Sequence, residues 1–368
     1  MIPIVNHKYK YILLYSAKAG CSSMRSLYLD IHKDEFDKDE LAALDKYHNL
    51  NEVHRYVVGE DYSDYFTYIL TRNPYSRVVS AFLDQYVYLR NAQVQKMLSE
   101  FPFGDEQEPQ NFIEFLEYLK TIPDGQRDSH FQTQTFTDFA DLIVTPADLR
   151  FRLTGMKHQH AFAVKYVGDI SEFDRHTKAV FKRIFNKDQA KHDLALSLLG
   201  ETKKRNTSFY GKQDFKNAAL LTVKELDELN FAPKPQDFYT DQRAIDLVNE
   251  IYRDDFKWFK YPMGNIPEKR ASKEVDLLPE DLDWQTYIKL SPDLFKHQVY
   301  NKRSVIRHYL EFGRFEPVPR AYKIVAPDGF DWKKYLNLYP DLGAAGITTE
   351  VAAIEHYLSY GAREGRAI

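Results

Sequence analysis

Two short segments of the sequence carry residue types that can hold a phosphate group. The first, SAKAGCSS at residues 16–23, lies between an apolar run and a helical pattern. Backbone amides and the positive end of a helix dipole converge at such a position, which favours anion binding. The phosphate-loop pattern of nucleotide triphosphatases, G-x-x-x-x-G-K-[ST], is missing because Lys18 precedes Gly20. Taken alone, the segment is explained equally well by an ordinary turn with capping serines.

The second segment, TRNPYSRVVSAF at residues 71–82, changes that balance. It places the guanidinium of Arg72 at the end of a strand pattern and the hydroxyl of Ser80 on the helix that follows. A charged fork and a hydroxyl at this spacing can close on one phosphate. A surface arginine and a helix serine would explain this segment in isolation. Together, the two segments favour a site for a ligand with phosphate groups.

The elements around these segments predict a layered α/β domain. Residues 9–15 and 66–70 have strand patterns, and each strand is followed by one polar segment and then by a helix, at about residues 23–31 and 75–90. Two such units bring two helix N-termini to the carboxyl edge of one parallel sheet. Further helices are expected at residues 111–120, 174–186, 188–199, 216–229 and 241–256, and further strands at 142–144 and 166–167.

The organisation of the chain predicts a domain at residues 1–262, a linker at 263–281 and a helical module at 282–368. The length of 368 residues suits more than one domain, and the linker combines prolines and charges without an apolar period. In the last segment residues recur at a single offset of 48 positions, which indicates two copies of a small helical unit. The matched pairs include Asp283/Asp331, Trp284/Trp332, Tyr287/Tyr335, Asp293/Asp341, Leu294/Leu342, His308/His356, Tyr309/Tyr357, Leu310/Leu358, Gly313/Gly361 and Glu316/Glu364.

Composition excludes several classes of protein. With 50 Lys+Arg against 54 Asp+Glu, the formal charge of −4 argues against a nucleic-acid coat or a polybasic membrane-surface protein. The apolar share of 43% excludes wholesale disorder. A single cysteine excludes an intrachain disulfide and a multi-cysteine zinc site. No apolar stretch approaches the roughly 18 residues that span a bilayer, so a soluble, cytoplasmic protein without stable membrane insertion is expected.

Together, the two polar segments resemble the sulfotransferases that use 3'-phosphoadenosine 5'-phosphosulfate (PAPS), and most closely the carbohydrate sulfotransferases of the chondroitin type. In that family a K-x-G-C-[ST]-[ST/N] loop holds the 5'-phosphosulfate, and an R-[DN]-P-[FY]-x-R-x-x-S-A-[FY] segment holds the 3'-phosphate. The resemblance implies a three-layer, P-loop-like α/β domain with a parallel central sheet. It continues more weakly through DSHFQTQ at 128–134, YVGDI at 166–170, NTS at 206–208 and IYRDDF at 251–256.

This resemblance implies PAPS as donor, no metal, and a carbohydrate acceptor in a polysaccharide or a glycolipid. Lys18 would stabilise the charge that grows on the bridging oxygen while an acceptor hydroxyl attacks sulfur in line. Cys21 is expected to be a small packing residue. Phe131, in place of the family's tryptophan, leaves the acceptor open. The residues expected to hold the donor are Lys18, Ala19, Gly20, Cys21, Ser22, Ser23, Arg72 and Ser80.

A group must accept the proton of the acceptor hydroxyl, and histidine suits this role near neutral pH. His48 is the first candidate, because its surroundings resemble the H-L-x-x-L segment of the family. His130 and His54 are rivals, and a carboxylate such as Glu52 is a further alternative. With Lys18, the expected catalytic residues are therefore His48 and His130.

Two other functions fit parts of the sequence. A phosphate-loop kinase would need Mg²⁺ held by a loop hydroxyl and an acidic partner. A glycan-binding or scaffold protein could keep the fold without turnover. The two C-terminal copies have the apolar spacing of a small helical core. They also resemble short repeats appended to bacterial glycan-modifying enzymes, which implies docking on a polymer or on a partner in glycan assembly.

Overall fold

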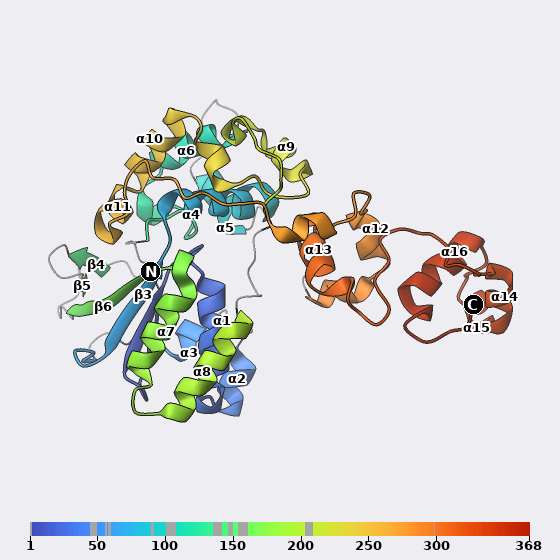
Figure 1. Ribbon diagram of the computed structural model, residues 1–368, viewed down its shortest axis with the longest axis horizontal. Coiled ribbons are helices and arrows are strands. Elements are labelled where there is room, and N and C mark those ends of the chain that lie inside the picture. The colour runs from blue at the N-terminus through green and yellow to red at the C-terminus, as the bar shows by residue number, and fades with distance from the viewer. Residues whose placement is uncertain are drawn as a thin grey trace. The chain divides into compact units, whose positions relative to one another are not determined.

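The chain forms two compact units, Met1–Arg270 and Ala271–Ile368 (Figure 1). The boundary between them lies inside the segment expected to be a linker. The structure is a computed structural model, and it describes residues 2–44, 50–55, 57, 60–89, 92–100, 108–134, 142–145, 150–153, 161–202, 209–297 and 299–368.

The first unit is a mixed α/β domain built on a six-stranded sheet in the order β1-β2-β3-β6-β5-β4. Strands β2, β3 and β6 at its centre run parallel, whereas β1, β5 and β4 pair antiparallel towards the two edges. The strands are β1 (Ile2–Asn6), β2 (Tyr11–Tyr15), β3 (Phe66–Thr71), β4 (Leu142–Thr145), β5 (Arg150–Leu153) and β6 (Ala161–Asp169). The strand patterns of the sequence predicted β2, β3, β4 and part of β6, but not β1 and β5.

Some helices of this unit lie along the central strands, and others lie beyond one end of the sheet (Figure 1). No helix in the described ranges is long and apolar enough to cross a membrane. The helices are α1 (Cys21–His32), α2 (Lys38–Ala43), α3 (Leu50–Val53), α4 (Pro74–Ala81), α5 (Ala92–Glu100), α6 (Phe112–Thr121), α7 (Phe173–Ile184), α8 (Gln189–Thr202), α9 (Val223–Glu228), α10 (Gln242–Ile251) and α11 (Arg253–Phe259).

Both faces of the central strands are apolar, because neighbouring residues of a strand point to opposite sides. On one face, Leu13 and Leu70 belong to a buried cluster with residues of α1, α7 and α8. On the other face, Ile12 and Ile69 cluster with two buried tyrosines, and Trp258 of α11 packs against them. A third cluster, beyond the sheet, joins α4 to α6 and α10. The parallel strands are therefore buried on both sides, as expected for an α/β domain.

Two of the helices expected from the sequence differ in the structure. The helix expected at 216–229 is shortened to α9, because Thr222 forms a capping box with Glu225 and starts a new helix. The helix expected at 241–256 is divided into α10 and α11 at Tyr252, whose hydroxyl donates to the carbonyl of Phe131 at 2.8 Å. In both places a local cap or a tertiary hydrogen bond overrides helical propensity.

The second unit is helical, and matched positions of its two sequence copies make matched contacts. The hydroxyl of Tyr287 lies 2.8 Å from Nδ1 of His308, and that of Tyr335 lies 3.0 Å from Nδ1 of His356. Both tyrosines are fully buried. The helices are α12 (Trp284–Lys289), α13 (Lys302–His308), α14 (Trp332–Leu338), α15 (Pro340–Ala344) and α16 (Glu350–His356), and the last helix of each copy continues into a π-helical turn, Tyr309–Gly313 or Tyr357–Gly361.

Each π-helical turn ends at a glycine that lies against the buried tyrosine of its copy. A Cβ atom at Gly313 would collide with the hydroxyl of Tyr287, and one at Gly361 would collide with the hydroxyl of Tyr335. Each tyrosine is also held by a histidine and is buried, so it has little room to move. The glycine is therefore required by close packing in both copies.

We predict that Gly313→Ala lowers the free energy of unfolding by about 1–3 kcal/mol, because the added methyl group overpacks the Tyr287 contact. Gly343→Ala is the matched control: it lies in α15, where an added Cβ would meet nothing within 4 Å. That change should be neutral or stabilise by less than about 1 kcal/mol. Urea unfolding followed by tryptophan fluorescence measures both, and equal losses for the two variants would contradict the packing role of Gly313.

Candidate functional site

The first polar segment forms the loop between β2 and α1. Gly20 precedes the helix in a left-handed conformation with φ of 76°, which suits glycine. No side chain caps this end of α1. The backbone amides of the first turn, which have no partner within a helix, therefore lie at the loop together with the serines of α1. Within the loop Ala19 is buried, and Cys21, the first residue of α1, packs against the neighbouring apolar cluster.

The second polar segment forms the connection from β3 to α4. Asn73 caps α4 by accepting a hydrogen bond from the backbone N–H of Tyr75 at 3.0 Å, and Pro74 occupies the first turn. The helix therefore begins directly after the strand. Arg72 is left at the carboxyl end of β3, next to β2 in the parallel sheet.

The two segments meet through Arg72. Its Nη1 donates to the carbonyl oxygen of Lys18 at 3.0 Å. The Arg72 side chain is only partly exposed, and burial lowers its pKa. A desolvated guanidinium attracts an anion more strongly than an exposed one does. The guanidinium of the second polar segment therefore contacts the loop formed by the first.

Gln134 fixes the backbone of Arg72. The side-chain amide of this buried glutamine accepts from the backbone N–H of Arg72 at 2.8 Å and donates to its carbonyl at 2.8 Å. The backbone N–H of Gln134 in turn donates to Oδ1 of Asp255 at 2.6 Å. In the sequence, the stretch around Gln134 has only a weak resemblance to the family and no role for Gln134 is evident.

Arg77, the second arginine of the segment, is buried with its charge. It is 1% exposed and lies 3.4 Å from a carboxylate oxygen of Asp255, which is fully buried. Its guanidinium also donates to the backbone carbonyls of Gln132, at 2.6 Å, and His130, at 3.3 Å. The ring of Tyr252 lies 5.0 Å beneath it. Arg77 therefore holds the stretch 128–134 against α4, and through that stretch it supports Arg72.

Lys18 is paired with a carboxylate that sequence analysis did not find. Its Nζ lies 2.5 Å from Oδ2 of Asp84, in the π-helical segment Phe82–Leu89 that continues α4, and both side chains are partly exposed. Gln85 donates to the same oxygen at 2.8 Å. The only sequence signal is that Asp84 follows Ser80 by one turn of helix. An anion that binds Lys18 must compete with this carboxylate.

Ser76 and Ser80 are four residues apart in α4, so they lie on one side of this helix. Ser80 is half-buried. The hydroxyl of Ser76 is buried and makes no hydrogen bond within the described part of the chain. Ser76 is thus a further hydroxyl on the face that carries Ser80, and sequence analysis left it out.

The candidate bases differ in their burial and in their hydrogen bonds. His48 lies outside the described residues. His54 is half-buried, its Nδ1 is hydrogen-bonded to the hydroxyl of Tyr28, and burial lowers its pKa. It also stacks on Phe36 with the ring centroids 4.5 Å apart. Glu52, on α3, is exposed. The contacts of His54 are those of a packed core histidine.

His130 has the arrangement of an oriented acid–base histidine. Its Nδ1 lies 2.7 Å from Oδ1 of Asp128, whose side chain is fully buried, and its own side chain is 25% exposed. A carboxylate on Nδ1 holds the ring and leaves Nε2 as the nitrogen that can exchange a proton with a substrate. The carbonyl of the same residue accepts from Arg77, so the histidine is tied to the segment that carries Arg72. Across the described ranges, no group of three or more His, Cys, Asp or Glu could hold a metal ion.

We predict a pH-dependent contribution of Asp255 to stability. Burial raises its pKa to about 6, although Arg77 opposes the shift. Because this value lies above the ordinary 3.8, the folded chain takes up the proton first, and stability falls as pH rises from about 4 to about 6. Relative to Asp255→Asn, the wild type should therefore lose up to about 3 kcal/mol between acid and neutral pH.

Urea unfolding at several pH values measures this difference. Asp254→Asn, at an exposed position of the same helix, is the control and should follow the wild type. A constant difference between the wild type and Asp255→Asn at all pH values would show that the carboxyl group is not perturbed.

Comparison with known proteins identifies the family of the first unit. A model of the sulfotransferase family matches residues 3–262. No curated protein and no solved structure matches the chain. The matched residues include the central sheet, both polar segments and the buried network that supports Arg72, whereas the second unit lies beyond them. Because the match covers well over half of the 368 residues, the chain belongs to the sulfotransferase family, whose members transfer sulfuryl groups.

Proposed function

We propose that this protein transfers a sulfuryl group from PAPS to a hydroxyl of a carbohydrate, in a polysaccharide or a glycolipid, by in-line displacement. The observation that carries the proposal is the 3.0 Å hydrogen bond from Arg72 to the carbonyl of Lys18. It joins the two polar segments at the carboxyl edge of parallel strands, where α/β domains bind their ligands. The three-layer, P-loop-like architecture and the chondroitin-type relationship belong to this proposal.

The donor fits the groups that surround this contact. The backbone amides and hydroxyls of the loop and first turn, from Ala19 through Ser23, would hold the 5'-phosphosulfate. Arg72 and Ser80 would hold the 3'-phosphate. Arg72 has five N–H donors, of which one binds the Lys18 carbonyl, and its side chain is also hydrogen-bonded to Tyr210.

Lys18 would act on the bond that breaks. The acceptor oxygen forms a bond to sulfur while the bond from sulfur to the bridging oxygen breaks, and negative charge grows on that oxygen. The ammonium group of Lys18 meets this charge, and adenosine 3',5'-bisphosphate leaves. Before the donor arrives, Asp84 holds the same ammonium at 2.5 Å. Binding of the donor therefore exchanges a carboxylate for the bridging oxygen as the partner of Lys18.

A histidine would take the proton from the acceptor hydroxyl. The contact with Asp128 supports His130, because it orients the ring and stabilises the imidazolium that forms. His48 also stays a candidate for the general base, because its sequence surroundings resemble the H-L-x-x-L segment of the family. A general base of this type is needed because a sugar hydroxyl is a weak nucleophile until its proton is removed.

The second unit would assist the same reaction by binding the acceptor or a partner, without contributing catalytic groups. We assign residues 1–262 to catalysis, 263–281 to a linker and 282–368 to a module that docks the enzyme on a glycan polymer or on a partner in glycan assembly. A tethered second site raises the local concentration of the acceptor without changing the catalytic groups. The single cysteine of the chain supports a reducing, cytoplasmic location.

Transfer of radiolabelled sulfate from PAPS to a panel of glycans tests the function directly. We expect labelled glycan, unaffected by excess ATP or by EDTA. Loss of transfer with EDTA and its recovery with Mg²⁺, together with transfer of the γ-phosphate of ATP, would establish a kinase instead. Tight binding of adenosine 3',5'-bisphosphate without transfer to any glycan would establish a binding or scaffold protein.

Lys18 and Arg72 are predicted to affect different kinetic constants. Lys18→Ala should lower kcat by about 100-fold or more and change the KM for PAPS little, because the charge it meets appears in the transition state. Arg72→Ala and Ser80→Ala should instead weaken binding of PAPS and of adenosine 3',5'-bisphosphate by about 10-fold. Adenosine 5'-phosphosulfate, which lacks the 3'-phosphate, should bind these two variants as it binds the wild type.

Lys224→Ala, which removes an exposed lysine of α9, is the matched control and should leave both constants unchanged. A Lys18 variant with only a raised KM would remove Lys18 from the transition state. Equal losses for both nucleotides in Arg72→Ala would mean that Arg72 supports the fold rather than the 3'-phosphate.

A further inference from the structure

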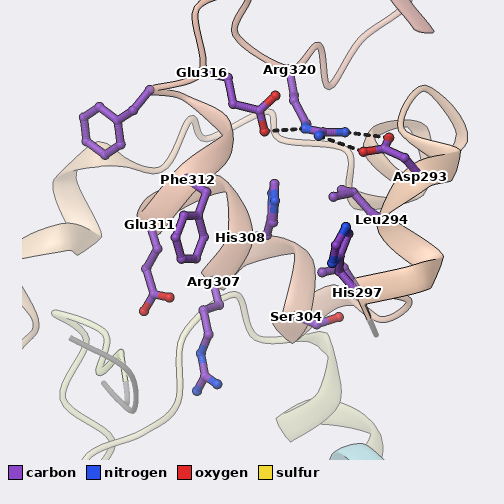
Figure 2. A pocket seen from close by; sticks show the side chains of 12 residues that line it. Asp293, Leu294, His297, Ser304, Arg307, His308, Glu311, Phe312, Glu316 and Arg320 are labelled. Atoms are coloured by element: carbon purple, nitrogen blue, oxygen red, sulfur yellow. Dashed lines mark hydrogen bonds and ion pairs between the residues drawn. The ribbon is translucent and has the colours of Figure 1, made fainter. Parts of the chain in front are cut away.

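The unit Ala271–Ile368 contains a cavity that the proposed reaction does not use (Figure 2). Its volume is about 740 Å³, within the range of sites that bind small molecules. It lies in the first sequence copy, between the short helical segment Pro292–His297 and the helix that runs from α13 into its π-helical turn. Charged, aromatic and aliphatic side chains all contribute to its wall.

Comparison of the two copies separates the lining residues that the fold needs from those that it does not. At some lining positions the second copy has the same or a similar residue at the 48-residue offset: Asp293/Asp341, Leu294/Leu342, His308/His356, Phe312/Tyr360 and Glu316/Glu364. At others it has a different residue: His297/Ala345, Ser304/Ala352, Arg307/Glu355, Glu311/Ser359 and Phe315/Arg363. Both copies make the same internal tyrosine–histidine contact. The second set of side chains is therefore not required to form the helical unit.

One wall of the cavity is fixed by an ion-pair network. Nη1 and Nη2 of Arg320 donate to the two oxygens of Asp293 at 2.8 Å each, and Nε donates to Glu316 at 2.6 Å. Figure 2 shows this guanidinium between the two carboxylates. Only 9% of the Arg320 side chain is exposed. The two-fold pairing resists rotation of either group, so the wall is formed before any ligand arrives.

The opposite side of the cavity combines an aromatic surface with groups that can form hydrogen bonds. Phe312 is 60% exposed, and its ring lies 5.7 Å from that of His308. Arg307 and Glu311 are one turn apart on the same helix, and Figure 2 shows their side chains projecting from the same side of it. Oε1 of Glu311 is buried and accepts no hydrogen bond from any described residue. An unused buried acceptor is unfavourable without a ligand, and the exposed ring of Phe312 supplies an apolar surface beside it.

This combination suits a molecule with an apolar face and a rim of hydroxyl groups. The C–H face of a sugar ring can pack on an aromatic ring, while carboxylate and guanidinium groups pair with its hydroxyls. The charges of the wall disfavour an anionic sugar. Three carboxylates, Asp293, Glu311 and Glu316, face two guanidiniums, Arg307 and Arg320, so no positive charge is left in excess.

We propose that this cavity binds an uncharged sugar unit of a glycan. The inference rests on the proposed function, because it supplies the site through which the second unit would hold the acceptor polymer. It assigns different tasks to the two copies. The first copy binds the sugar, and the second copy retains the helical unit and an exposed ring at Tyr360 but has Glu355 and Ser359 in place of Arg307 and Glu311.

Isothermal titration of the full chain with uncharged hexasaccharides of glucose, mannose, galactose and N-acetylglucosamine tests the proposal. At least one of them should bind, and Phe312→Ala should weaken that binding by about 10-fold. Glu311→Gln, which keeps the shape of the side chain, should weaken it by several-fold. The matched control is Tyr360→Ala, which removes the equivalent exposed ring of the second copy and should leave the dissociation constant unchanged. Circular dichroism checks that each variant is folded.

Three results would overturn the proposal: no binding of any uncharged hexasaccharide at millimolar concentration, equal weakening by Phe312→Ala and Tyr360→Ala, or tighter binding of a chondroitin sulfate hexasaccharide that salt abolishes. Sulfate transfer to a disaccharide acceptor is measured on the same protein. Sugar binding without transfer would reject the proposed function and leave the cavity as a sugar site. Sulfate transfer without sugar binding would reject the sugar site and leave the proposed function standing.

Discussion

The burial of Arg77 and Asp255 is the constraint on which the donor site depends. A buried carboxylate is costly unless it is paired and hydrogen-bonded, and here Asp255 is opposed by Arg77 and accepts from Gln134. Gln134 then holds both backbone groups of Arg72. One carboxylate in the core thus determines the position of the arginine at the end of β3. Loss of any member would leave a polar group unpaired inside the domain.

The donor site itself is nearly neutral before a ligand is bound. Asp84 offsets the charge of Lys18, and the charge of Arg72 is opposed by Asp169 while its guanidinium donates to the loop carbonyl. A site with both cations uncompensated would bind many anions. The ion pair therefore favours a ligand that can satisfy the amides of the loop, Arg72 and Lys18 at the same time. Specificity in such an arrangement comes from geometry more than from net charge.

The two copies in the second unit show that a contact can be maintained when its position in the sequence shifts. Asp293 is paired with Arg320, and the equivalent Asp341 is paired with Arg366. The two aspartates are 48 residues apart, but the two arginines are 46 residues apart. The arginine lies in an irregular segment after the π-helical turn, where the chain can take a longer or a shorter path to the same carboxylate. The 48-residue offset therefore matches the helical positions of the two copies but does not match Arg320 with Arg366.

The sequence by itself determined the features that have a local signal: the parallel strands, the two polar segments and the duplicated helical unit. Tertiary structure alone decided β1, at one edge of the sheet, and β5, between β6 and β4, whose short or charged segments become strands by pairing with their neighbours. It also decided the partners of the site residues. Asp84 reaches Lys18 across 66 positions of the chain, and Asp255 reaches Gln134 across 121. No local pattern encodes such contacts, because hydrogen bonds and ion pairs depend on distances in space that only the folded chain establishes.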